Sequence, residues 1–246
     1  QIMQESKNFK TLFIFLFAFN SSFFAQRLDW VKSISGTGQI NRMASTLDAS
    51  GNVYAIGRFQ GTVDFDPGSG IVNLTSNGGA DVFIQKLTSS GNLVWAKSFG
   101  GTLNELGSFL AIDGSGNVYT TGYFQGTVDF DPGSGIVNLT SNGGEDIFIQ
   151  KLTSSGNLIW AKSFGGSSND NVNSSSVDSS GNFYIMGFFG GTVDFDPDIS
   201  TVNLTSNGGA DVYIQKISSS GNLVWAKSFG GSSSDYPASI SVDASG

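Results

Sequence analysis

The sequence of 246 residues contains no cysteine and no histidine. The lack of cysteine excludes disulfides, thiolate metal sites and thiol nucleophiles. The lack of histidine removes the commonest general base and the commonest zinc ligand. Ser-His-Asp catalysis, imidazole-bound metals and histidine-ligated haem are therefore excluded within this chain.

Charge is also scarce. Charged residues make up 13% of the chain, about half of the usual ~25%. The 12 Lys and Arg face 20 Asp and Glu, which gives a net charge of −8. Nucleic-acid partners need a basic footprint, so none is expected. The 39% of hydrophobic residues, including 21 Phe, can still build a core, so wholesale disorder is not expected.

The N-terminal segment has the pattern of a secretory signal. Lys7 and Lys10 precede an apolar run over residues 12–19, and Ala25 stands before the expected cut. The run is too short to span a bilayer, which needs ~20 apolar residues. A buried amphipathic helix fits less well, because the run is apolar all round. We therefore predict a signal peptide over residues 1–25 and an exported chain, extracellular or at the cell surface, without a membrane span after cleavage.

The rest of the chain repeats with a period of 65 residues. Residues 61–101 and 126–166 differ at only three of 41 positions, and residues 191–231 differ from the first copy at seven. Such self-similarity is typical of a repeat architecture, and it is stronger evidence for the fold than any local motif. The period is marked by four tryptophans: Trp30, Trp95, Trp160 and Trp225.

One unit contains four short runs rich in β-branched and aromatic residues, separated by Gly, Ser, Asn and Asp. In the second copy these runs cover residues 109–112, 118–124, 147–152 and 158–164. Four such strands in an antiparallel meander form a propeller blade. A WD40 blade takes ~40–45 residues, so the surplus of about 20 matches an arm around Asp-Phe-Asp-Pro. A β-solenoid has shorter repeats, and a β-sandwich would not repeat one unit almost verbatim.

Three motifs of the unit follow one family pattern. They are D-x-F-x-x-K-L at 146–152, S-G-N-x-x-W-A at 155–161 and D-x-S-G-N-x-Y-x-x-G at 113–122. Together with the Gly-Gly connector they resemble the SBBP β-propeller repeat of exported bacterial proteins, over about residues 28–246. The resemblance implies a β-propeller and export but leaves the biochemical role undefined. The Asp-Phe-Asp-Pro arm departs from the shorter family unit.

The expected fold is therefore all-β, a partial β-propeller of four-stranded antiparallel blades over residues 26–246. Three complete units are expected at about 43–99, 108–164 and 173–229, flanked by lone strands at Leu28–Ile34 and Ser239–Asp243. Propellers usually have 4–8 blades. We therefore hypothesise that the chain is a fragment of a longer reading frame, whose final blade the early strand would complete.

Paired aspartates recur in each arm as Val-Asp-Phe-Asp-Pro: Asp64 and Asp66, Asp129 and Asp131, Asp194 and Asp196. Residues i and i+2 of a strand share one face, so the paired carboxylates converge. In one interpretation the second Asp caps a turn and the first is solvated. In another, the pair binds Ca²⁺ together with backbone carbonyls. A catalytic pair is disfavoured, because acid–base roles need unequal environments at one site.

Other recurring residues have structural interpretations. Asp48, Asp113 and Asp178 begin D-x-S-G-N turns that resemble the start of an EF-hand loop but lack its later ligands, so turn capping is predicted. The tryptophans are expected to pack between blades rather than to stack a sugar or a quinone. A glycine within each second strand should permit close approach of a neighbouring strand: Gly57, Gly122 and Gly187.

The copies diverge in the connectors between units, at residues 102–106, 167–171 and 232–236. In a propeller these loops should share an end with the arms, and variable loops on a constant scaffold commonly carry binding. The favoured function is therefore a non-enzymatic binding, adhesion or scaffold module with protein or glycan partners. A Ca²⁺-dependent structural or carbohydrate-binding propeller is the first alternative. An enzyme whose active site lies in blades outside this sequence is the second.

Overall fold

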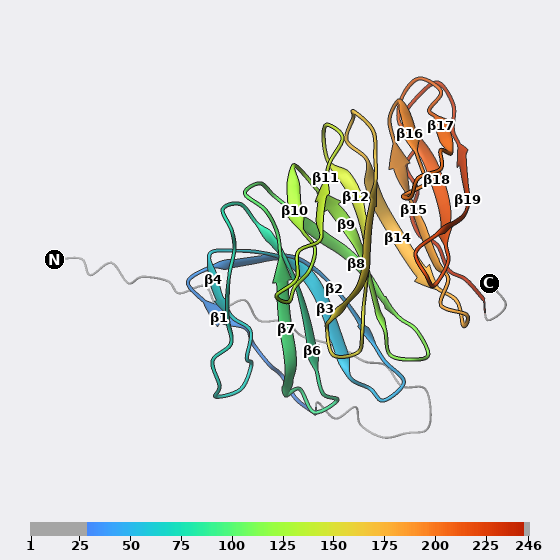
Figure 1. The fold of residues 1–246 in the computed structure, drawn as a ribbon. Helices are drawn as coiled ribbons and strands as arrows, with labels where there is room; N and C mark the ends of the chain where they lie inside the picture. Colours follow the sequence, from blue (N-terminus) through green and yellow to red (C-terminus); the bar gives the residue numbers. More distant parts are fainter. Residues whose placement is uncertain (1–28, 244–246) are drawn as a thin grey trace.

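The computed structural model describes residues 29–243, and in this range all regular structure is β-strand (Figure 1). The predicted all-β class is confirmed. The predicted signal peptide lies outside the described residues. Between residues 29 and 243 the chain forms no helix with the length and apolar character needed to cross a membrane.

Each 65-residue unit folds into one four-stranded antiparallel sheet, with the strands in sequence order apart from an inserted arm. The first sheet contains β2 (Gln39–Leu47), β3 (Val53–Gln60), β6 (Asp81–Leu87) and β7 (Leu93–Phe99). The second contains β8 (Leu106–Ile112), β9 (Val118–Phe124), β12 (Asp146–Leu152) and β13 (Leu158–Phe164). The third contains β14 (Asn171–Val177), β15 (Phe183–Phe189), β18 (Asp211–Ile217) and β19 (Leu223–Phe229).

The predicted arm is a short hairpin between the second and third strands of each sheet. Its strands are β4 (Thr62–Asp64) with β5 (Asn73–Thr75), β10 (Thr127–Asp129) with β11 (Asn138–Thr140), and β16 (Thr192–Asp194) with β17 (Asn203–Thr205). In each hairpin the two threonines at the base face each other and share a hydrogen bond.

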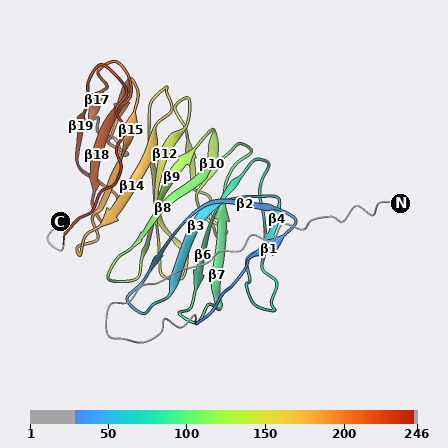
Figure 2. The same ribbon diagram turned by 180° about the vertical axis from the view of Figure 1, so that it is seen from behind.

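The three sheets stand side by side like a fan, from the first unit to the third (Figures 1 and 2). The first strands meet along the inner edge, where β8 contacts both β2 and β14. The core lies between successive sheets. One cluster joins Tyr54, Ile56 and Val82 of the first unit to Val118 and Phe148 of the second. Blades that stack through their faces around a common inner edge form a partial β-propeller.

The arm fills the space between blades through its central phenylalanine. Phe65, Phe130 and Phe195 are fully buried. The ring of Phe130 lies 5.0 Å from Phe99 of the preceding unit and 5.2 Å from Phe148 of its own sheet. Burying one such side chain contributes about 1.5–3 kcal/mol. The residues that make the unit longer than a WD40 blade therefore form part of the interface between blades.

The D-x-S-G-N turns are held by their aspartate, as predicted. Asp48 Oδ1 accepts the backbone N–H of Ser50 and of Asn52, each at 2.9 Å. Gly51 adopts φ +78°, a left-handed conformation that glycine reaches at little cost. The same bonds recur at Asp113 and Asp178.

The strand glycines permit the close approach that the sequence indicated. A Cβ added at Gly122 would overlap the carbonyl oxygen of Leu106 on the neighbouring strand. That neighbour, β8, carries a β-bulge opposite, between Gly107 and Phe109. The other first strands are bulged at the equivalent place. Each blade thus bends its inner strand where the second strand has no side chain.

The predicted lone strands are not formed. Residues 29–34 have no strand assignment, and only β1 (Ser35–Gly36) pairs, with β4 of the first arm. Residues 239–243 are likewise outside any strand, although the Ile240 amide donates to Ser174 Oγ at 3.1 Å. A strand needs a neighbouring ladder to satisfy its backbone groups, and neither segment has one along its length. The complete sheets also begin earlier than predicted, at residues 39, 106 and 171.

Candidate interaction site

The connectors and the chain that follows each arm meet at one end of the blades, as predicted. The Glu105 amide donates to the Ala80 carbonyl at 2.8 Å, and the Ala80 amide donates to Asn104 Oδ1 at 3.0 Å. The same backbone bond recurs from Asp170 to Glu145 and from Asp235 to Ala210. These bonds fix the connectors, so this end presents ordered loops rather than loose ones.

The residues that differ between connectors project outward. Thr102, Leu103 and Asn104 are exposed, as are Ser167–Asn169 in the next connector. The third connector leads to an exposed Tyr236, whose ring packs edge-on against Phe188 at 4.9 Å. A polar, mostly uncharged surface with isolated apolar side chains is therefore displayed on a nearly constant scaffold.

Beneath these loops lie several buried carboxyl groups, whose burial the sequence analysis did not predict. Asp81 begins β6 and Glu105 lies in the connector, and their exposed fractions are 1% and 0%. Asp81 Oδ2 accepts the Asn77 amide at 3.1 Å, and Glu105 Oε2 accepts the Gly101 amide at 3.0 Å. The second oxygen of each group has no hydrogen-bond partner within the described part of the chain.

Burial strongly raises the pKa of these acids. Loss of solvent raises the pKa of Asp81 to about 6 and that of Glu105 to about 7, and the hydrogen bonds to backbone amides only partly oppose it. In the next unit, burial likewise raises the pKa of Asp146 and of Asp170 to about 6. These carboxyl groups are thus neutral in mildly acidic solution. The sequence did contain a signal, because an acid recurs at the same phase in each otherwise divergent connector.

The arm aspartates predicted to bind metal act as turn caps. Asp64 Oδ1 accepts the amides of Asp66 at 3.0 Å and of Val72 at 2.8 Å, and Asp66 Oδ1 accepts the Gly68 amide at 2.7 Å. The first Asp is therefore a cap as well and not simply solvated, which corrects that part of the interpretation. Equivalent bonds are made by the other four: Asp129, Asp131, Asp194 and Asp196.

The arm carboxylates come together in pairs. Among residues 29–243 no group of three or more acidic side chains is placed to hold one metal ion. Any cation at an arm would have to take its remaining ligands from backbone carbonyls or water. Calcium binding by these pairs stays a prediction.

At the opposite end of each blade, hydrogen bonds join one unit to the next. The carbonyl oxygen of Ser154, in the last hairpin of the second unit, accepts Trp95 Nε1 at 3.1 Å and Lys86 Nζ at 3.3 Å from the first unit. Ser219 accepts Trp160 and Lys151 in the same way. The interblade role predicted for these tryptophans is confirmed.

A hollow opens along the inner edge, where the first strands converge. It is lined by Met43, Ser108, Phe109, Asn171, Asn173 and Phe188. Its walls are mixed apolar and amide, without an acidic or basic side chain among these six residues. It offers hydrogen bonds and apolar contact but no group suited to acid–base work.

Comparison with known proteins agrees with a repeat fold. No protein-family model matches the chain, so the SBBP assignment remains a prediction. Over 227 aligned residues, covering 80% of this chain, it is 24% identical to an uncharacterized WD repeat-containing protein of Acanthamoeba polyphaga mimivirus. It is 28% identical to the regulatory protein FlaEY of Caulobacter vibrioides over 209 residues, 82% of this chain. The chain spans only 16% and 21% of these two relatives. Sequence and structure together describe a β-propeller-type repeat protein.

Proposed function

We propose that this protein is an exported, non-enzymatic β-propeller that binds partner proteins through its connector end. The observation that carries the proposal is where the variation lies. Units that match at 38 of 41 positions between residues 61–101 and 126–166 differ in the exposed connectors. Changing loops on a fixed support allow recognition to vary while the fold is kept. Three nearly equal blades also offer repeated contacts, which raise avidity.

The relatives support a binding or scaffold role. One is named for its WD repeats and the other as a regulatory protein, and neither name states a reaction. The site points the same way. The buried acids of the first two units are neutral at mildly acidic pH and lie in similar surroundings in both units, whereas catalysis needs one site with groups in unequal roles.

The test uses two probes, a random-peptide display library and a glycan array. Residues 26–246 hold every residue that the structure describes, and they form the reference protein. Replacing Thr102–Asn104 and Ser167–Asn169 by Gly-Ser-Gly should abolish peptide capture. A control with Ser90→Ala and Ser155→Ala, at the opposite end, should retain it. Capture that survives the connector replacement contradicts the proposal, and binding to glycans alone assigns a carbohydrate partner instead.

Export is tested separately by expressing the chain with and without residues 1–25 and measuring its appearance outside the cytoplasm. The full chain should be exported and shortened by about 25 residues, as its signal pattern predicts. The chain lacking the segment should stay inside. Equal distribution of both forms would remove export from the proposal.

A calcium-dependent role is a second candidate, which one feature of the arm favours. The turn bonds of every arm aspartate go to Oδ1, and Oδ2 is the carboxylate oxygen that a hard cation, which prefers oxygen ligands, would take. Calorimetric titration with Ca²⁺ should give heat that is lost in a triple Asp66→Asn, Asp131→Asn, Asp196→Asn variant. No heat at millimolar Ca²⁺ with the reference protein would exclude this candidate.

A further inference from the structure

The junction between the first and second blades buries two carboxyl oxygens that have no partner. Asp81 Oδ1 and Glu105 Oε1 accept no hydrogen bond from the described part of the chain, although their side chains are 1% and 0% exposed. Within residues 29–243 neither carboxyl forms an ion pair with a lysine or arginine. Buried charges are normally paired or coordinate a metal, because an uncompensated one is costly. These two oxygens therefore point to a ligand that carries positive charge.

Both oxygens lie against the same Gly-Gly connector. A Cβ added at Gly100 would lie 2.5 Å from Asp81 Oδ1, and a Cβ added at Gly101 would lie 3.7 Å from Glu105 Oε1. The Glu105 amide donates to the carbonyl of Ala80, the residue before Asp81, at 2.8 Å. The two acids are thus held at one place, beside glycines that leave space where other residues would carry a side chain.

A backbone carbonyl of the second unit adds a third oxygen. The Thr127 carbonyl oxygen lies 3.0 Å from the position that a Cβ of Gly101 would occupy. In the arm hairpin the Ser141 amide donates to the Gly126 carbonyl at 3.0 Å. Hydrogen-bonded and non-hydrogen-bonded pairs alternate along an antiparallel ladder, so the next pair, Thr127 with Thr140, turns its backbone groups away from the hairpin. The Thr127 carbonyl is therefore directed to the side where the connector lies.

The equivalent positions of the neighbouring units do not offer this set. Asp170 takes the place of Glu105 at the next junction, and both of its oxygens accept backbone amides. Oδ2 accepts the Gly166 amide at 2.7 Å, and Oδ1 accepts the Gly190 amide at 3.3 Å. In the first unit the same position holds the apolar Ile40. The free pair of oxygens thus belongs to the junction at Asp81 and Glu105.

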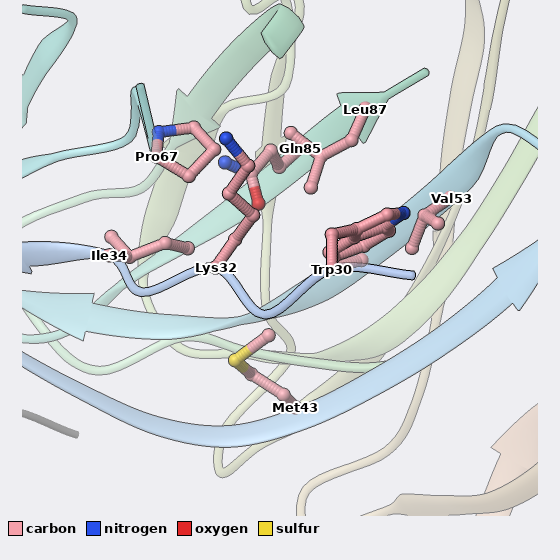
Figure 3. A pocket seen from close by; sticks show the side chains of 9 residues that line it. Trp30, Lys32, Ile34, Met43, Val53, Pro67, Gln85 and Leu87 are labelled. Atoms are coloured by element: carbon pink, nitrogen blue, oxygen red, sulfur yellow. The ribbon is translucent and has the colours of Figure 1, made fainter. Parts of the chain in front are cut away.

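The cavity beneath residues 30–34 is of a different kind (Figure 3). Its lining includes the apolar side chains of Ile34, Met43 and Leu87, and its charged member is Lys32. None of the nine residues that line it is acidic. A cation has no carboxylate to bind there, in contrast to the junction described above.

We propose that Asp81 and Glu105 bind one Ca²⁺ ion between the first and second blades, with the Thr127 carbonyl oxygen as a further ligand. Calcium takes about 6–8 oxygen ligands in flexible geometry, and carboxylates, backbone carbonyls and water all serve. Its two charges balance the two carboxylates. Water can supply the remaining ligands, because the overlying residues 102–104 are exposed.

The ion would join three parts of the chain. Asp81 belongs to the sheet of the first blade, Glu105 to the connector and Thr127 to the arm of the second unit. Bound calcium would therefore fix the first connector to both of its blades. The site is separate from the arm aspartates, and it does not depend on the proposed binding of partner proteins.

The test is calorimetric titration of chelator-treated protein, residues 26–246, with Ca²⁺ at about pH 7. The starting protein is the triple Asp66→Asn, Asp131→Asn, Asp196→Asn variant, in which heat from the arms is lost. It should still bind one ion per chain. In this background Glu105→Gln should weaken binding at least about tenfold, because ligand charge sets calcium affinity. Glutamine keeps an acceptor for the Gly101 amide, so the fold should survive, which circular dichroism checks. Asp81→Asn is titrated as a second variant.

The matched control is Asp170→Asn, which removes the same charge at the next junction. Both oxygens of Asp170 already accept amides, so calcium affinity should not change. A triple variant that takes up no Ca²⁺ at millimolar concentration overturns the proposal and leaves only the arms as calcium candidates. So does binding that neither Glu105→Gln nor Asp81→Asn weakens, or binding that Asp170→Asn weakens to the same degree.

Discussion

Replacing one phenylalanine in three equivalent positions offers a stability test within a single chain. Phe99, Phe164 and Phe229 stand in identical Trp-Ala-Lys-Ser-Phe-Gly-Gly segments, so local sequence and strand geometry are shared. Phe99 and Phe164 lose nearly all solvent contact between blades, whereas Phe229 keeps about half. Truncating a buried phenylalanine to alanine costs about 3–5 kcal/mol through lost burial and the cavity left behind. Phe229 is only about half buried, so its truncation gives up about half of a full burial contribution of about 1.5–3 kcal/mol, or roughly 0.8–1.5 kcal/mol.

We therefore expect Phe99→Ala and Phe164→Ala to lower the melting temperature by roughly 6–20 °C, at about 2–4 °C per kcal/mol for a chain of this size. Phe229→Ala should lower it by only about 2–6 °C. The assay is thermal unfolding by circular dichroism at the same low protein concentration for all three variants. Equal losses at all three positions would refute the reasoning, because they would mean that local strand structure, not contact between blades, sets the stability.

Three further predictions test other parts of the structure. Because the pKa values of Glu105 and Asp170 are raised above their unfolded values, the folded protein holds protons that the unfolded chain releases, so stability should fall as pH rises from about 4 to about 7. Glu105→Gln should reduce this loss in the free energy of unfolding by up to about 3 kcal/mol. Urea titrations at about pH 4 and about pH 7 measure the loss, and an equal loss in the variant and the unchanged protein would contradict the prediction. Gly122→Ala should destabilise by more than about 3 kcal/mol, since its methyl group would overlap a backbone carbonyl; a mild effect in the same titration would show that the strands can separate. Asp129→Ala should cost about 1–2 kcal/mol by leaving two backbone amides uncapped, whereas Asp129→Asn, which keeps an acceptor oxygen, should cost less.

Much of the fold could be predicted because the four main strands of each unit pair only with one another, within a four-stranded sheet. The strands of one blade and the turns between them lie within 65 residues, so periodicity and turn residues specify them. The lone strands could not be judged in this way. A short β pattern becomes a strand only beside a partner, and residues 29–34 meet the first blade through side chains such as Trp30 rather than through a backbone ladder.

The candidate site was less predictable because its geometry depends on contacts between units. The connector acids look like solvated loop residues, and nothing local shows that Glu105 lies under its own loop. The arm aspartates could be assigned to a turn from Asp-Pro-Gly. The second bond to Asp64, from Val72 eight residues on, depends on how the hairpin closes. The packing of the tryptophans between blades was predicted, but their hydrogen bond to a serine carbonyl could be seen only with the neighbouring blade in place.

The close identity of the first two units bears on how the chain folds. A strand such as β12 would fit the place of β6 with only a Val82-to-Ile147 exchange in its sequence, so pairings shifted by a whole unit compete with the native ones at similar energy. Repeat proteins of this kind are prone to trapped and exchanged states. Contacts of short sequence separation form fastest, and here these are the hairpins within each blade. Early closure of those hairpins would commit each strand to its own sheet before a wrong copy can compete.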